Sequence, residues 1–179
     1  MRNPFKIISD YWQIKRDPVR FARKIGVQVG DNCRLLSTNV RTFGSEPYLI
    51  KIGNHVTVTA GVRFINHDGG VWVFREREPD IEVFGTIEIG NNVFIGMDTL
   101  ILPGVKIGDN CVIGAGSIVT RSIDPNSVAL GAPAKRLKSV DEYRESIDHR
   151  VVHVRSKSPA DKRKWLETKF GFGTTNSNG

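Results

Sequence analysis

The chain has 179 residues, 39% of them hydrophobic, which is enough for one substantial core but not for two ordinary domains. No apolar run approaches the roughly 20 residues of a membrane span, and the first residues lack the apolar run and cleavage site of a signal peptide. We therefore expect one main domain with appendages, located in the cytoplasm and without an integral membrane segment.

The net charge of +7 is concentrated near the two ends of the chain. Residues 1–24 contain seven Lys and Arg against two acids, and residues 135–169 contain eleven against six. Proteins that bind nucleic acid usually combine such charge with aromatic platforms or a recognisable motif, and neither is visible here. We expect no nucleic-acid partner and attribute part of the basic charge to a phosphorylated cofactor.

Residues 1–24 combine apolar and basic side chains at roughly helical spacing. The apolar positions are Phe5, Ile8, Tyr11, Trp12, Val19 and Phe21. This pattern predicts one or two short amphipathic helices that form an N-terminal cap on the domain that follows.

Large aliphatic residues recur every six positions in the second half of the chain. They are Ile89, Ile95, Ile101, Ile107, Ile113 and Val119. Two residues before each comes a second, often smaller residue, which alternation in a strand places on the same face. These second positions are Ile87, Val93, Thr99, Val105, Cys111 and Ser117. The spacing predicts short strands with a narrow packed interior, separated by turns that are rich in glycine.

Strands this short bury a face only by stacking in successive coils, so the repeat predicts a solenoid with three hexapeptides per coil. The same spacing continues upstream at Ile52, Val58 and Phe64. Further upstream it is displaced by one residue from Leu35, which predicts a register adjustment near residues 44–47. We place the repeat domain at residues 25–138.

A loop interrupts the repeat. Phe64 and Ile89 are 25 residues apart, which we interpret as one 18-residue coil plus seven extra residues, with the inserted loop at 68–86. The loop begins at Asn66-His67-Asp68 and contains Trp72, Phe74 and a run of charges. Loops on rigid scaffolds often carry function.

After the repeat, residues 139–169 are highly charged and poor in glycine, which predicts a C-terminal helix, and residues 171–179 read as a flexible tail. Cys33 and Cys111 occur in matching strings, Val-Gly-Asp-Asn-Cys and Ile-Gly-Asp-Asn-Cys, and we expect both to be reduced and packed inward. A disulfide and a nucleophilic thiol are the alternatives.

The sequence of residues 89–138 resembles that of the hexapeptide-repeat acetyltransferases, in particular those that modify sugars and surface polysaccharides. The shared strings are Ile-Gly-Asn-Asn-Val-Phe-Ile-Gly, Ile-Leu-Pro-Gly-Val-Lys-Ile-Gly, Val-Ile-Gly-Ala-Gly-Ser-Ile-Val-Thr and Gly-Ala-Pro-Ala-Lys. The resemblance implies a mainly β fold, a left-handed parallel β-helix with N-terminal and C-terminal helical appendages. It also implies a homotrimer with sites at subunit interfaces and acetyl-CoA as co-substrate, without a metal. The chain departs from many family members at Phe94, where they have tryptophan.

The resemblance makes His67 the catalytic residue. Histidine titrates near neutral pH and is a common general base, which is what an alcohol needs to attack a thioester. Its neighbours Asn66 and Asp68 are candidates to bind acceptor hydroxyls or to orient the imidazole. The alternative is that residues 66–70 form only a polar turn.

The resemblance also implies cofactor contacts. Gly114, Ala115 and Thr120 are expected to contact the pantetheine arm, and Lys135 and Lys138 the phosphates. For the oxyanion we expect backbone amides near Gly96 and Met97, which also belong to the cofactor site. Small residues permit close backbone approach, and lysines neutralise phosphate. The alternative is that these residues are ordinary turn and surface positions.

We expect an O-acetyltransferase for a sugar or polysaccharide precursor. Other acceptors, namely an antibiotic, an amino acid or an amino sugar, and a non-catalytic binding or scaffold subunit stay open. A carbonic anhydrase on the same helix resembles a site of three histidines, whereas the repeat here has only His55 and His67. His149 and His153 are four apart, a spacing that allows metal chelation on a helix, but no further ligand motif accompanies them.

Overall fold

The computed structural model describes residues 12–39 and 41–172. The chain divides into two compact units, Met1–Tyr143 and Arg144–Gly179, which are treated separately. Phe5, Ile8 and Tyr11 lie outside the described residues.

Short helices precede the strands in the first unit. Residues 12–16 are helical, and helix α2 spans Pro18–Lys24. The Asp17 side chain caps α2 by accepting a hydrogen bond from the Arg20 amide at 2.9 Å. Phe21 and Ala22 are buried, and Ala22 belongs to the main core cluster. Helix α2 therefore covers the beginning of the strand region.

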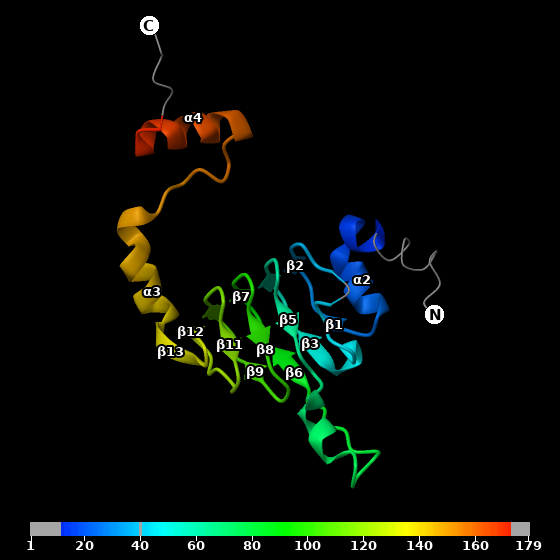
Figure 1. The fold of residues 1–179 in the computed structure, drawn as a ribbon. Helices are drawn as coiled ribbons and strands as arrows, with labels where there is room; N and C mark the ends of the chain where they lie inside the picture. The colour runs from blue at the N-terminus through cyan, green and yellow to red at the C-terminus, as the bar shows by residue number, and fades with distance from the viewer. Residues whose placement is uncertain (1–11, 40, 173–179) are drawn as a thin grey trace, which may run out of the picture. The chain divides into compact units, whose positions relative to one another are not determined.

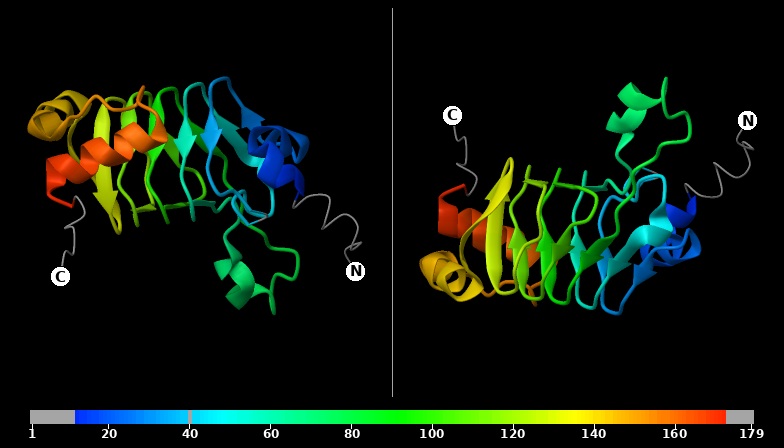
Figure 2. Two further views of the ribbon diagram at one scale, coloured as in Figure 1. Left: turned by 90° about the horizontal axis from the view of Figure 1, so that it is seen from above. Right: turned by 90° about the horizontal axis from the view of Figure 1, so that it is seen from below.

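The rest of the first unit consists of short strands that stack in coils (Figures 1 and 2). They are β1 (Gln28–Val29), β2 (Arg34–Leu35), β3 (Ile50–Ile52), β4 (Thr57–Val58), β5 (Arg63–Phe64), β6 (Ile87–Ile89), β7 (Val93–Ile95), β8 (Leu100–Ile101), β9 (Lys106–Ile107), β10 (Cys111–Ile113), β11 (Ile118–Val119), β12 (Ser127–Gly131) and β13 (Ala134–Ser139). Every pairing is parallel except that of β12 with β13.

The strands form three sheets, and from β3 to β11 the chain visits them in turn. We call β1-β3-β6-β9 face A, β2-β4-β7-β10-β12-β13 face B, and β5-β8-β11 face C. The turns between them run along three edges, which we call corners A/B, B/C and C/A. A side chain's place in the sequence thus determines its face or corner.

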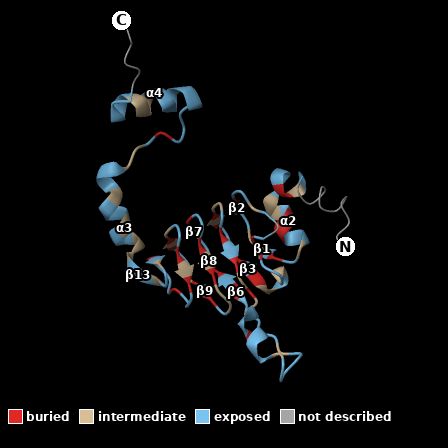
Figure 3. Cartoon of the chain, viewed as in Figure 1, coloured by how far each residue is buried: buried red, intermediate tan, exposed pale blue. Residues whose placement is uncertain are grey.

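The predicted six-residue spacing is confirmed by the strand register. Ile52, Ile89 and Ile107 are in register on face A, Val58, Ile95 and Ile113 on face B, and Phe64, Ile101 and Val119 on face C. All nine side chains are at most 3% exposed. Figure 3 shows buried segments, in red, along the strands of successive coils. Because each coil repeats this pattern, burial of apolar surface accumulates from coil to coil.

The expected size of the interruption was wrong. Face C strand β5 is followed directly by face A strand β6, and Ile52 pairs with Ile89. A step between faces takes six residues elsewhere in the repeat, so the 25 residues from Phe64 to Ile89 contain 19 extra residues rather than seven. The loop at 68–86 is the whole of this insertion, and it projects from corner C/A (Figure 2).

The upstream register adjustment is present, in a segment that contains the predicted residues 44–47. Leu35 pairs with Val58, and Val29 pairs with Ile52. The extra residues therefore lie between Leu35 and Ile50, in a segment that ends with the 3₁₀ helix η1 (Pro47–Leu49).

The C-terminal region differs from the single predicted helix. Helix α3 spans Val140–Ile147, the 3₁₀ helix η3 spans Asp148–Arg150, and α4 spans Pro159–Phe170. Ser158 caps α4 ahead of Pro159, whose missing amide hydrogen suits a first helical position and interrupts a continuing helix. Among the described residues, no helix has the length and apolar character to cross a membrane.

A ladder of side chains runs along corner A/B. His55, Asn92, Asn110 and Asn126 occupy equivalent turns with φ of 54° to 56°. His55 Nδ1 contacts Asn92 Oδ1 at 2.8 Å, Asn92 donates to Asn110 Oδ1 at 2.9 Å, and Asn110 donates to Asn126 Oδ1 at 3.1 Å. Asparagine tolerates the left-handed conformation better than most residues, so at three of these four positions the same residue type serves both turn and ladder.

The ladder predicts an order of stabilities at Asn110. We expect Asn110→Gly to lower the free energy of unfolding by about 1–2 kcal/mol, because it removes two side-chain hydrogen bonds. We expect Asn110→Ala to cost about 1 kcal/mol more, because alanine must also adopt a positive φ. Urea unfolding of both variants measures the difference. An alanine variant as stable as the glycine variant would contradict the assigned role of the backbone conformation.

Candidate functional site at corner C/A

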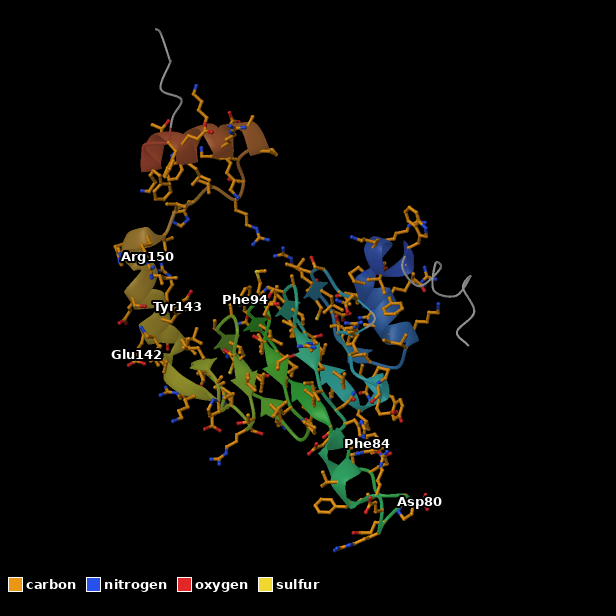
Figure 4. All side chains as sticks on the ribbon, in the orientation of Figure 1. Asp80, Phe84, Phe94, Glu142, Tyr143 and Arg150 are labelled. Atoms are coloured by element: carbon orange, nitrogen blue, oxygen red, sulfur yellow. The ribbon has the colours of Figure 1, made fainter. Side chains whose placement is uncertain are left out.

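His67 lies where the chain leaves the coils for the inserted loop. The loop closes on itself at this point: His67 forms an antiparallel bridge with Phe84, and the Gly85 amide donates to the Asn66 carbonyl at 3.0 Å. The His67 and Phe84 rings stack with centroids 4.9 Å apart. Figure 4 labels Phe84 near the coils and Asp80 farther out along the loop. The histidine therefore stands on a closed neck and not on a loose loop.

Gly85 allows the returning chain to lie against the next coil. A side chain at this position would meet the Gly104 amide at 2.4 Å and the Pro103 backbone at 2.8 Å. Only glycine avoids such a contact. The neck is thus fixed against the turn at residues 103–104.

An ion-pair chain holds the His67 imidazole. Nε2 of His67 lies 2.6 Å from Oε2 of Glu82, and the other oxygen of this carboxylate pairs with the Arg75 guanidinium. His67 remains 32% exposed. A carboxylate at one imidazole nitrogen fixes the tautomer, with that nitrogen carrying the hydrogen. Nδ1 then retains its lone pair and is available as a base.

Asn66 is buried, and its side chain makes hydrogen bonds within the protein, an arrangement that suits the second of its two predicted roles, orienting His67, better than contact with an acceptor. It is 1% exposed, and its amide group donates to the Phe43 and Glu46 carbonyls at 3.2 and 2.7 Å. Its oxygen accepts from the Glu46 amide at 3.3 Å. These bonds connect the preceding coil to the neck, so Asn66 holds the backbone that positions the next residue, His67.

Asp68 begins the short helix inside the loop. Its carboxylate accepts from the Gly70 amide at 2.9 Å and thereby caps the 3₁₀ helix η2 (Gly69–Phe74). The residue is exposed, so a contact with an acceptor stays a prediction.

Four of the predicted cofactor residues lie together at corner B/C. Gly96 and Gly114 occupy equivalent turns, and a side chain on Gly96 would meet the Ala115 amide at 2.5 Å. Met97 is 52% exposed, and Ala115 is also exposed. The Gly96 amide donates to the Ile113 carbonyl at 2.8 Å, which leaves the Met97 amide as the candidate oxyanion donor.

The remaining predicted cofactor residues lie elsewhere. Thr120 follows β11 at corner C/A, the corner that carries His67. Lys135 and Lys138 belong to strand β13, where they pair with Leu130 and Val128. The structure therefore does not bring the predicted residues into one place: His67 and the group around Met97 lie on opposite edges of face C.

The cysteines occupy equivalent positions, as predicted, with unequal burial. The Cys33 thiol donates to the Gly53 carbonyl at 3.1 Å and the Cys111 thiol to the Asp124 carbonyl at 3.3 Å. Both are free; Cys111 is buried, whereas Cys33 is partly buried and packs against the core, so both face inward as expected. Burial raises the pKa of the Cys111 thiol, which disfavours a nucleophilic thiolate.

His149 and His153 do not share a helix, since the first lies in η3 and the second in the irregular segment after it. Within residues 12–39 and 41–172, no group of three or more His, Cys, Asp and Glu side chains has an arrangement that holds a metal ion.

Known proteins match this architecture. Residues 86–121 match the family model for bacterial transferase hexapeptide repeats. Protein CapG of Staphylococcus aureus is 53% identical over 148 residues, which cover 83% of this chain and 86% of that protein. The chain belongs to the hexapeptide-repeat acetyltransferases. Galactoside O-acetyltransferase of Escherichia coli is 37% identical over 70% of this chain, and the match spans 60% of the enzyme's length.

A solved structure supports the fold. The hexapeptide-repeat acetyltransferase VCA0836 of Vibrio cholerae superposes with a TM-score of 0.57, at 19% identity, over 76% of this chain and 89% of that one. In the present chain, the residues that match the family model, 86–121, include strands β6 to β11 and corner B/C. His67 and the loop precede them.

Three residues around His67 were missed by sequence reasoning, namely Arg75, Glu82 and Phe84. They lie in a segment without periodicity, where the run of charges at residues 75–79 predicts no particular partner. The only signal was that acids and bases occur together in a loop that follows a histidine.

Proposed function

We propose that the chain transfers an acetyl group from acetyl-CoA to a hydroxyl of a sugar or polysaccharide precursor in the cytoplasm. The observation that carries the proposal is the His67–Glu82 contact of 2.6 Å on a closed neck, which assigns the hydrogen to Nε2 and leaves the lone pair on Nδ1. The family membership supports acetyl transfer, and the named activity of the E. coli relative supports a sugar hydroxyl.

In the proposed reaction, Nδ1 of His67 accepts the hydroxyl proton while the acceptor oxygen forms a bond with the acetyl carbonyl carbon. The charge that develops on the carbonyl oxygen is stabilised by a backbone amide, for which Met97 is the candidate. When the carbon–sulfur bond breaks, the imidazolium returns the proton to the leaving thiolate. Glu82 stabilises the imidazolium throughout, and no metal takes part.

The residues at corner B/C suit a thin, flexible ligand. Ala115 and Met97 are exposed beside turns in which glycine already allows the backbones to lie close together. Lys135 and Lys138 place two cations on β13, beyond the last parallel strand. We propose that the pantetheine arm contacts the corner and Thr120, and that the lysines hold the phosphates.

The separation of His67 from corner B/C favours an assembly. If triangular coils pack flat around a threefold axis, corner C/A of one copy meets corner B/C of the next only when face A packs against face B. Packing face B against face C would instead place corner C/A beside corner A/B. We therefore propose a trimer, with coils left-handed as in the family, in which face A contacts face B and each site contains residues of two copies.

The outward side chains of these faces are compatible with that contact. The central outward positions of face A are Gln28, Lys51, Glu88 and Lys106, and those of face B are Arg34, Thr57, Phe94 and Val112. Lysine stems cover apolar surface while their charges remain solvated, so Lys51 and Lys106 can pack over Phe94.

The first prediction concerns the base. We expect His67→Ala to lower turnover about 10²–10⁴-fold with little change in the affinity for acetyl-CoA. Glu82→Gln should lower kcat by about 10–100-fold, because the neutral amide does not stabilise the imidazolium. Steady-state kinetics with a sugar panel measure both.

The matched control is His153→Ala, an exposed histidine of the second unit, which should retain full turnover. Wild-type turnover in His67→Ala would refute the base. A rise in turnover in Glu82→Ala would show that the carboxylate occupies the place of the acceptor.

The second prediction concerns the cofactor. Lys135→Ala and Lys138→Ala should each raise the KM for acetyl-CoA by about tenfold with kcat nearly unchanged, because they bind a part of the ligand remote from the carbonyl. The effect should shrink as salt is added. Lys162→Ala, on an exposed position of α4, is the control. Acetyl-pantetheine lacks the nucleotide phosphates, so equal losses with it and with acetyl-CoA would exclude phosphate contacts.

The third prediction tests the assembly. Phe94→Asp, at the outward centre of face B, should dissociate the trimer in light scattering, because it places a carboxylate in the interface. Leu100→Asp, at the outward centre of face C, should leave it trimeric. Dissociation of both variants would indicate that faces B and C pack together. A monomeric wild-type chain would refute the assembly.

A further inference from the structure

The inserted loop carries an exposed aromatic ring in a fixed position. Trp72 is 71% exposed, although it lies in η2 between the capping residue Asp68 and the neck. Its neighbour Val71 is buried and anchors this helix. An exposed tryptophan on an anchored helix presents a large apolar surface at a low cost in side-chain entropy.

One face of this ring is already occupied by a cation. The Arg75 guanidinium lies over the Trp72 ring, 5.6 Å from its centroid. The same guanidinium pairs with Glu82, which contacts His67 at 2.6 Å. Three successive contacts, through Arg75 and Glu82, therefore connect the indole to His67. The contact with Arg75 covers one indole face, so the other face is the open one.

The charge of the loop restricts what binds to that open face. Residues 68–86 contain five acids and only two basic residues, in a chain whose net charge is +7. An anionic group at this surface would be repelled, and hydroxyl groups would find acceptors in the carboxylates. The carbon–hydrogen face of a pyranose ring is apolar and packs on aromatic rings, while its hydroxyls remain free for hydrogen bonds.

We propose that Trp72 is the binding platform for an uncharged sugar ring of the acceptor, next to the ring that is acetylated. The guanidinium and the carboxylate separate Trp72 from His67, so the two side chains serve different rings. This inference rests on the proposed sugar acetylation and makes the preferred acceptor an oligosaccharide or a glycoside with a second neutral ring.

The test compares two acceptors that share the reacting sugar, methyl β-galactoside and lactose, in wild type and Trp72→Ala. Wild type should use lactose with a kcat/KM roughly fivefold higher than that for methyl β-galactoside, as expected for one aromatic contact. Trp72→Ala should reduce this ratio to about one with little change for methyl β-galactoside, and Trp72→Phe should retain most of it. Phe74→Ala, an exposed aromatic of the same helix, is the matched control and should keep the wild-type ratio.

Binding is followed separately through tryptophan fluorescence, which lactose should quench in wild type but not in Trp72→Phe. Quenching without acetylation of either sugar would refute the proposed function and leave the platform standing. Acetylation of both sugars with equal kcat/KM, and no quenching, would overturn the platform alone. A lower mass of Trp72→Ala in light scattering would also overturn it, since the ring would then pack against a second copy.

Discussion

The stacking of equivalent aliphatic side chains in successive coils is the constraint on which the rest of the structure depends. Ile52, Ile89 and Ile107 remain in register although 37 residues separate the first pair and 18 the second. Any extra residues must therefore leave the coil at a corner and return to the same corner. This is why the insertion has a closed neck, with Gly85 lying against the turn at 103–104.

The same constraint determines where chemistry is possible. Inward positions are filled by packed side chains, and even the small polar ones direct their hydroxyls to turn carbonyls, as Thr99 does to Gly96 at 2.8 Å and Ser117 to Gly114 at 2.6 Å. Polar reactive groups are therefore left to corners and outward positions. His67 occupies the transition, because its backbone belongs to the neck while its imidazole is held by residues of the loop.

Periodicity explains which parts were predictable. The positions that pack inward were read from the sequence, because each strand makes the same contact as its neighbours at a fixed spacing. Glu82 was not, since it reaches His67 across 15 residues of a segment with no repeat, where the pairing depends on how η2 and the neck fold together. The size of the insertion and the helix break before Pro159 were not predicted either, because charge and glycine content alone do not reveal where a chain changes direction.

The distribution of the predicted site residues gives the proposed trimer a physical reason. A solenoid coil holds its corners apart at a distance set by its core, so groups at corners C/A and B/C of one chain cannot approach one another by any change in side-chain conformation. A second copy solves this problem without altering the core, since a neighbour's corner can lie beside His67 while both coils keep their register. The rigidity that makes the repeat stable then also makes the geometry of the proposed site reproducible. The loop does not follow the repeat, so it is the part of the chain in which acceptor recognition can vary.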